Sequence, residues 1–329
     1  MKILLTMIAL LASLCSVAQD NDAVAGNTAA PQPVRIAQMM TCDPMMRNYP
    51  YALPSLLEEL SAKTGIKADP QPVIIKSFET KDILKYPFIY VNFADRENWE
   101  LSPEEIKNLR GYLDRGGFIF IDAGINAEFL RENKIFGQQH SFANWQVCPE
   151  VEKAFKQIYP DANFRTLKRT HDVFHCFYEG LPDSSTLPDS VREYTVNEKW
   201  PEGTYSLLGL NVKGRVAVIV SPIISMGWGK DSFGRWIGAI NFRVKEGVQG
   251  LDTRLKTAAY SGTKYPVVRE DGKKDMVYCQ AGDIRPEWVS EAEGDWRVFR
   301  YYNSTEISDF AHVFHTRLGI NIFVYAFTQ

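Results

Sequence analysis

Asp122 is the side chain whose type and position most favour chemistry in this sequence. It follows the uninterrupted apolar run of residues 118–121, which predicts a central parallel strand covered on both faces, and Ala123-Gly124 then completes a tight turn. Ligands of open α/β sheets bind at the carboxyl ends of such strands. A carboxylate there can contact a ligand, bind a metal or act as a base, or it can cap the turn backbone. The sequence leaves both kinds of role open.

Two histidines four positions apart, His171 and His175, form a second candidate site. If this segment were helical they would share one face, as metal ligands can. The zinc motif with a catalytic glutamate between two such histidines is not present, because Asp172 and two apolar residues intervene. We therefore predict no metal and no cofactor. His171 is expected either to contact a ligand or to make a polar contact near the strand ends, and His175 to pack beside Phe174.

Asp95 begins a charged triplet, Asp95-Arg96-Glu97, after the apolar run of residues 88–91. That run predicts a second central strand, so the triplet would lie at the same sheet edge as Asp122. One of its charges could line a cleft there. The alternative, a solvated loop before the next helix, is the interpretation that the sequence favours.

Trp228 and Trp236 could form an aromatic platform for a carbohydrate, because such rings offer large rigid contact areas. The favoured alternative is a loop that anchors itself by packing Trp228 into the domain. His312 and His315, three positions apart near the C-terminus, are predicted at the edge of the core or in solvent rather than in catalysis.

Alternating helix and strand signals predict the elements that position these residues. Ser102 and Glu105 form a capping box with Pro103 in the first turn, which is typical of a helix start, and Gly116-Gly117 predicts the end of that helix. The alternation predicts an open, mostly parallel α/β sheet. Further helices are expected over residues 54–63, 147–159 and 305–327, the last interrupted at Gly319, and further strands over residues 73–75, 88–91 and 215–220.

The N-terminus predicts export. Lys2 supplies a positive charge, an apolar run of about 12 residues follows, and small residues precede a cleavage point after Ala18. Such a run is shorter than the roughly 20 residues that span a membrane. We therefore expect a signal peptide over residues 1–18, a flexible linker over residues 19–33, and a domain over residues 34–329 that works in the periplasm or outside the cell.

Composition limits the partners. The formal net charge is −3 and no basic stripe stands out, which argues against a nucleic-acid partner, and no second apolar run is long enough for a transmembrane span. Four cysteines remain after the predicted cleavage, Cys42, Cys148, Cys176 and Cys279. They allow three complete pairings, and the sequence does not choose between these and free thiols.

Four runs in order, over residues 86–90, 109–122, 171–178 and 318–326, resemble a bacterial family catalogued as domain of unknown function 4159. The resemblance implies a fold similar to class I glutamine amidotransferases, a flavodoxin-like three-layer α/β sandwich. Residues 230–303 depart from the family pattern. They are rich in charged residues, Gly and Trp, and are expected to be an insertion of loops and hairpins.

The resemblance also implies what the chain does not do. Amidotransferases place a catalytic cysteine at the turn that here reads Asp122-Ala123-Gly124, and a carboxylate cannot form the thioester that glutamine hydrolysis needs. We expect an exported, non-catalytic binding or scaffold protein for a small molecule or periplasmic protein. The alternative is a hydrolase that uses Asp122 as base or nucleophile and His171 as its proton partner or as a metal ligand. The expected ligand-binding residues are Asp95, Asp122, Gly124, His171, His175 and Trp228.

Overall fold

A computed structural model places most of the domain. It describes residues 32–41, 51–96, 98–124, 147–179, 184–197, 207–222, 224–228, 239–244, 255, 257–269, 271–294, 296–301 and 304–329. All the elements below belong to one compact unit, Pro33–Gln329. The predicted signal peptide and nearly all of the predicted linker lie outside the described residues.

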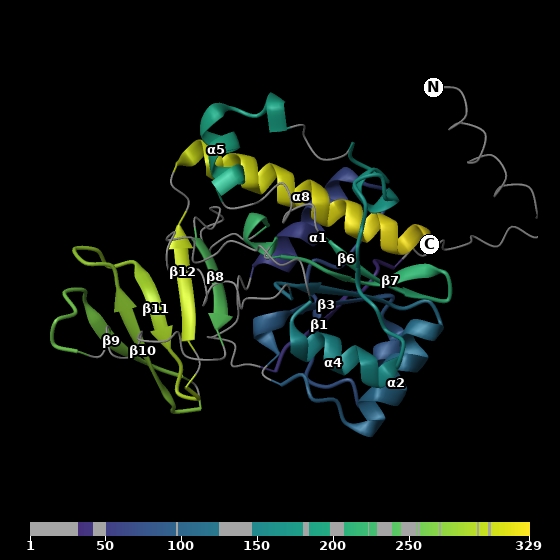
Figure 1. Cartoon of the computed structure of the whole chain (residues 1–329). Coiled ribbons are helices and arrows are strands. Elements are labelled where there is room, and N and C mark those ends of the chain that lie inside the picture. Colours follow the sequence, from purple (N-terminus) through teal and green to yellow (C-terminus); the bar gives the residue numbers. More distant parts are fainter. Residues whose placement is uncertain are drawn as a thin grey trace, which may run out of the picture. The chain divides into compact units, whose positions relative to one another are not determined.

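A seven-stranded sheet forms the centre of the domain (Figure 1), in the order β2-β1-β3-β4-β7-β6-β5. The first five strands in that order pair in parallel, and β6 and β5 extend the sheet by antiparallel pairing. The predicted α/β class with a mostly parallel sheet is confirmed. The strands are β1 Ala37–Met39, β2 Val73–Ile75, β3 Phe88–Asn92, β4 Phe118–Asp122, β5 Arg165–Thr166, β6 Leu208–Val212 and β7 Arg215–Val220.

Helices cover both faces of this sheet (Figure 1), because alternate strand residues point to opposite sides and both sets are apolar. Helices α1 (Ala52–Lys63) and α8 (Thr305–Thr328) pack on one face, where the rings of Phe88 and Phe323 stack with centroids 4.1 Å apart. Helices α2 (Pro103–Asp114) and α4 (Pro149–Ile158) pack on the other. This arrangement is compatible with a three-layer α/β sandwich.

Helix α2 begins and ends as the sequence predicts. The Ser102 hydroxyl accepts from the Glu105 N–H at 3.3 Å, and the Glu105 carboxylate accepts from the Ser102 N–H at 3.2 Å. After the helix, the Tyr112 hydroxyl donates to the Phe118 carbonyl at 3.0 Å, which ties the helix end to β4. A Cβ on Gly117 would lie 2.4 Å from the Tyr112 ring, so this position accepts only glycine without rearrangement.

Helix α8 runs unbroken from Thr305 to Thr328, so the predicted interruption at Gly319 is wrong. Gly319 instead permits close packing, because a Cβ there would lie 2.8 Å from the Leu56 side chain of α1 and 3.0 Å from the Trp228 ring. Tertiary packing of this apolar helix outweighs the roughly 1 kcal/mol that a helical glycine costs. Of the helices in the described ranges, none combines the length and apolar character needed to cross a membrane.

The described part of residues 239–301 forms a second sheet of five antiparallel strands, in the order β8-β12-β11-β10-β9 (Figure 1). Strands β9 to β12 are joined as successive hairpins, as the sequence suggested for this region. The strands are β8 Ala239–Val244, β9 Lys264–Val268, β10 Lys274–Cys279, β11 Pro286–Ser290 and β12 Trp296–Tyr301. The short helices are η2 Lys81–Lys85, η3 Phe93–Asp95, η4 Asp172–Phe174, η5 Ser184–Thr186, η6 Ser225–Gly227 and α5 Asp189–Asn197.

Candidate functional site

Asp122 lies at the carboxyl end of β4, as predicted, but its side chain is fully buried. Its neighbour in the parallel register is Asn92, the last residue of β3. The turn after it is tight: Ala123 has φ of 60°, in the left-handed region that residues with a Cβ rarely adopt. A Cβ on Gly124 would lie 2.6 Å from the Val220 side chain, so Gly124 occupies a packed position that accepts no side chain without rearrangement.

The Asp122 carboxylate accepts hydrogen bonds from six donors of the described residues. The Ser221 hydroxyl and the Ile224 N–H reach Oδ1, at 3.0 and 2.8 Å. The amide of Asn92 at 3.2 Å, the hydroxyl of Tyr90 at 3.4 Å, and the N–H and hydroxyl of Ser225 reach Oδ2. A buried carboxylate is expensive unless such donors replace its water. We call these five residues and Asp122 the Asp122 cluster.

Electrostatics in the Asp122 cluster follow from burial. Burial raises the pKa of the Asp122 carboxyl, and hydrogen bonds from Ser225, Ile224 and Ser221 act against that rise. Burial and the adjacent carboxylate raise the pKa of the Tyr90 hydroxyl well above its ordinary value, so it remains a donor. With both oxygens occupied by protein donors, the carboxylate joins the ends of three neighbouring strands to η6.

The loop that is hydrogen bonded to Asp122 also contacts α8. The His312 Nδ1–H donates to the Gly227 carbonyl at 2.8 Å, and the Trp228 indole N–H donates to the His315 carbonyl at 2.8 Å. A Cβ on Gly227 would lie 2.3 Å from the His315 Cβ. Both histidines are buried, which differs from the predicted positions at the core edge or in solvent, and burial lowers the pKa of His315 to about 3.

Trp228 is 1% exposed and packs against the rings of Tyr90 and Phe120, with centroids 5.9 and 6.0 Å away. A carbohydrate platform requires an exposed ring face, so the structure favours the alternative interpretation in which Trp228 anchors its loop. Trp236 lies outside the described residues.

The charged triplet after β3 does not form a solvated loop at its first two positions. Asp95 is fully buried, and its backbone carbonyl accepts from the Thr41 N–H at 2.8 Å. Arg96 is 4% exposed and pairs with the Glu105 carboxylate at 3.3 Å, beneath the start of α2. Glu97 lies outside the described residues. Arg96 thus connects this turn to the α2 capping box rather than to Asp122.

The two histidines of the segment from 169 to 179 flank the single-turn helix η4 rather than sharing a helix face. The half-buried His171 caps η4, with Nδ1 accepting from the Val173 N–H at 3.2 Å, and its ring lies 5.2 Å from that of Tyr325. Burial lowers the pKa of His171. His175 is exposed rather than packed, and its Nε2–H donates to the Arg169 carbonyl at 2.7 Å. The contacts described for His171 and for Asp122 share no residue.

An open pocket of about 680 Å³ lies beside His175, between the segment from 169 to 179 and α8. Asn321 of α8 builds one wall, because its side chain accepts from the Tyr178 N–H at 2.8 Å and donates to the Tyr178 carbonyl at 3.1 Å. We call this the α8 pocket. It is lined by Arg169, Thr170, Phe174, His175, Tyr178, Glu179, Leu187, Phe310, Val313, Phe314, Arg317, Leu318 and Asn321.

Of the residues predicted to bind a ligand, His175 is the one that lines the α8 pocket. The other lining residues were not chosen from the sequence, because they come from segments more than a hundred positions apart and share no local motif. The donors around Asp122 did carry a usable signal. Asn92 and Ser221 are the first polar residues after two predicted central strands, the same position that singled out Asp122.

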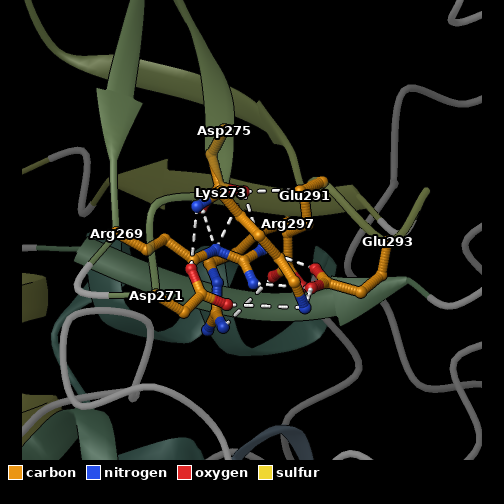
Figure 2. Close-up of polar contacts among 8 residues, drawn as sticks. Arg269, Asp271, Lys273, Asp275, Glu291, Glu293 and Arg297 are labelled. Atoms are coloured by element: carbon orange, nitrogen blue, oxygen red, sulfur yellow. Dashed lines mark hydrogen bonds and ion pairs between the residues drawn. The ribbon is translucent and has the colours of Figure 1, made fainter.

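A second buried polar cluster lies on the five-stranded sheet, where turns join β9 to β10 and β11 to β12 (Figure 2). Arg269 forms a bidentate ion pair with Asp275, with contacts from 2.6 to 3.0 Å, and also contacts Glu293. Arg297 pairs with Glu291 at 3.3 Å. The hydrogen bond from Arg269 lowers the pKa of Glu293 to about 2. These ion pairs link the two turns.

Three cysteines are described, Cys148, Cys176 and Cys279, and none of the three forms a disulfide bond with another. Cys42 lies outside the described residues. Burial raises the pKa of Cys176 to about 11, so this thiol is not an activated nucleophile. In the parts of the chain that the structure describes, no group of three His, Cys, Asp or Glu side chains converges as a metal site.

A family model described as Domain of unknown function (DUF4159) matches residues 35–327. The matched range covers both sheets and, except for the last residue of α8, the helices that the structure describes. No curated protein matches the chain.

Proposed function

This chain belongs to the DUF4159 family, and we propose that it is an exported, non-catalytic protein that binds a small molecule in the α8 pocket. One observation carries the proposal. The carboxylate best placed for catalysis, Asp122, is buried and fully hydrogen bonded, whereas the α8 pocket is open and has both apolar and charged walls. Ligand sites are typically pockets of about 300–1,000 Å³ with this mixture of surfaces.

The strand order supports the similarity to class I amidotransferases that we propose for the fold. The order β2-β1-β3-β4-β7 of the parallel strands corresponds to the 2-1-3-4-5 order of flavodoxin-like sheets. On this proposal Asp122 takes the place of the catalytic cysteine. Because a carboxylate cannot form the thioester intermediate, the chain would release no ammonia from glutamine.

The competing function, a hydrolase that uses Asp122 and His171, requires these groups to reach one substrate. General acid–base catalysis needs each group within hydrogen-bond distance of the reacting atoms or one water away. Asp122 is bonded to Ser221, Ser225 and their neighbours, and His171 is a helix cap beside Tyr325. These contacts favour a structural role for both, and therefore favour the binding protein.

Export is part of the proposal and has its own test. The positive Lys2, the apolar run and the small residues up to Ala18 support cleavage by a signal peptidase. Sequencing the N-terminus of the protein purified from its native cells should find Gln19 first. An N-terminus that retains Met1 would contradict export by a cleaved signal.

Binding can be tested with anilinonaphthalene sulfonate, whose fluorescence rises in apolar pockets. Titration of the full chain should give saturable fluorescence with one class of site. Val313 is on the pocket rim and 52% exposed, so Val313→Trp should obstruct the pocket and reduce this signal severalfold without unfolding the chain.

Ile284→Trp provides the matched control, because Ile284 is 85% exposed and does not line the pocket. If both variants reduce the signal equally, or neither does, the dye binds elsewhere and the proposed site is wrong.

A further inference from the structure

The rim of the α8 pocket carries more positive than negative charge. Arg169 and Arg317 lie on it with one acid, Glu179, and with His175. In the described part of the chain no carboxylate pairs with Arg317, whose guanidinium carbon lies 5.4 Å from the centre of the Tyr178 ring. Stacking occupies the face of a guanidinium and leaves its edge N–H groups for a planar anion. Arg317 is therefore oriented by Tyr178 without being neutralised.

The interior of the α8 pocket is apolar. Phe174, Phe314 and Leu318 line it and are 1%, 7% and 3% exposed, and the rings of Phe310 and Phe314 stack 5.8 Å apart. The buried amide of Asn321 is engaged with the Tyr178 backbone and offers a ligand little. A ligand in the α8 pocket would therefore contact aromatic and aliphatic side chains in the interior and positively charged side chains at the rim.

We propose that the ligand of the α8 pocket is an organic anion with an aromatic or branched apolar body. Its carboxylate would lie against the edge of Arg317 and its body against Phe314 and Leu318. This inference rests on the proposed function and adds the chemical class of the ligand. A charge-assisted bidentate contact at a partly solvated rim should strengthen binding about tenfold over a neutral analogue.

The test separates the charge from the body with three small molecules. Isothermal titration calorimetry of the full chain should show that phenylbutyrate binds about tenfold more tightly than phenylbutanol, which has the same body without the charge. Butyrate, which keeps the charge and lacks the ring, should bind still more weakly. Arg317→Gln should abolish the preference for phenylbutyrate over phenylbutanol, and Arg317→Lys should keep part of it.

Glu179→Gln provides a matched test of opposite sign, because it removes the acid of the rim at nearly constant volume. This variant should bind phenylbutyrate about twofold to threefold more tightly and should bind phenylbutanol with unchanged affinity. If phenylbutanol binds as tightly as phenylbutyrate, the anion inference is overturned while the binding function stands. If butyrate binds as tightly as phenylbutyrate, the apolar body contributes nothing to the affinity, only surface charge is involved, and the inference also fails. If none of the three binds, both the inference and the proposed function fail.

Discussion

The Asp122 cluster and the α8 pocket each contain a charged side chain, but the two side chains differ in burial and in hydrogen bonding. Asp122 is buried with six protein donors around it, whereas Arg317 lies at an open rim against an aromatic face. Position at the end of a central strand made Asp122 the stronger candidate from sequence. The comparison teaches that a residue suited to chemistry becomes a ligand site only if its hydrogen-bonding groups remain available.

Removing the Asp122 side chain should have the largest effect. Asp122→Ala leaves the buried hydroxyls of Ser221 and Ser225 and the Ile224 N–H without their acceptor, so we expect a loss of about 3–5 kcal/mol in the free energy of unfolding. Asp122→Asn keeps part of the acceptor capacity and should lose less. Urea unfolding measures both. A loss below about 1 kcal/mol for Asp122→Ala would show that the carboxylate is not structural and would return it to the catalytic candidates.

Gly227 connects the two regions and should give the next largest effect. A Cβ there would meet the His315 Cβ at 2.3 Å and the Ala311 carbonyl at 2.8 Å, so Gly227→Ala must push α8 away from the Asp122 cluster. We expect a loss of about 2–3 kcal/mol, together with weaker binding in the α8 pocket.

Gly111→Ala is the matched control, because nothing lies within 4 Å of its Cβ and it is in the interior of α2. It should stabilise the chain by up to about 1 kcal/mol. Equal behaviour of the two alanine variants would mean that α8 does not require the close approach at Gly227.

Protonation of His315 in acid should weaken the contact between η6 and α8. Burial lowers the pKa of this histidine from 6.5 to about 3, so below pH 6.5 the unfolded chain binds a proton that the folded chain does not. Stability is therefore lost as pH falls from 6.5 towards 3, by about 2 kcal/mol at pH 5 relative to neutral pH. His315→Gln should remove this part of the pH dependence. Urea unfolding of the original chain and of His315→Gln at pH 5 and at neutral pH measures this effect. If both proteins lose the same stability between the two pH values, His315 is not the group responsible.

A charge placed at the pocket rim should have the smallest effect on stability and a selective effect on binding. Val313 is 52% exposed, so Val313→Glu and Val313→Gln should each change the free energy of unfolding by less than about 0.5 kcal/mol. Val313→Glu should nevertheless weaken an anionic ligand about threefold relative to Val313→Gln, in a manner that high salt reduces. Calorimetry with phenylbutyrate at low and high salt distinguishes the two variants, and identical affinities would mean that the anion does not bind near this rim.

Local signals predicted much of the central fold. The capping box of Ser102 and Glu105, the glycines after α2 and the continuous apolar runs of β3, β4 and β7 each depend on neighbours within a few positions. The family that the sequence resembled is confirmed by a family model that matches residues 35–327. Strand β6 and the five-stranded sheet were not resolved from sequence, because their pairing partners had to be known before their short, mixed patterns could be interpreted.

The sequence by itself determined the class of the sheet, the position of Asp122 at the end of a central strand, and the absence of a cysteine at that turn. These depend on apolar periodicity and residue identity alone. The tertiary structure decided that Asp122 is buried, that Gly319 packs rather than breaks α8, and that Arg317 lies over the Tyr178 ring in the lining of a pocket. The physical reason is that the burial and hydrogen bonding of a residue depend on side chains that are distant in the sequence and become its neighbours only in the folded chain. The local sequence pattern around the residue does not specify which side chains these are.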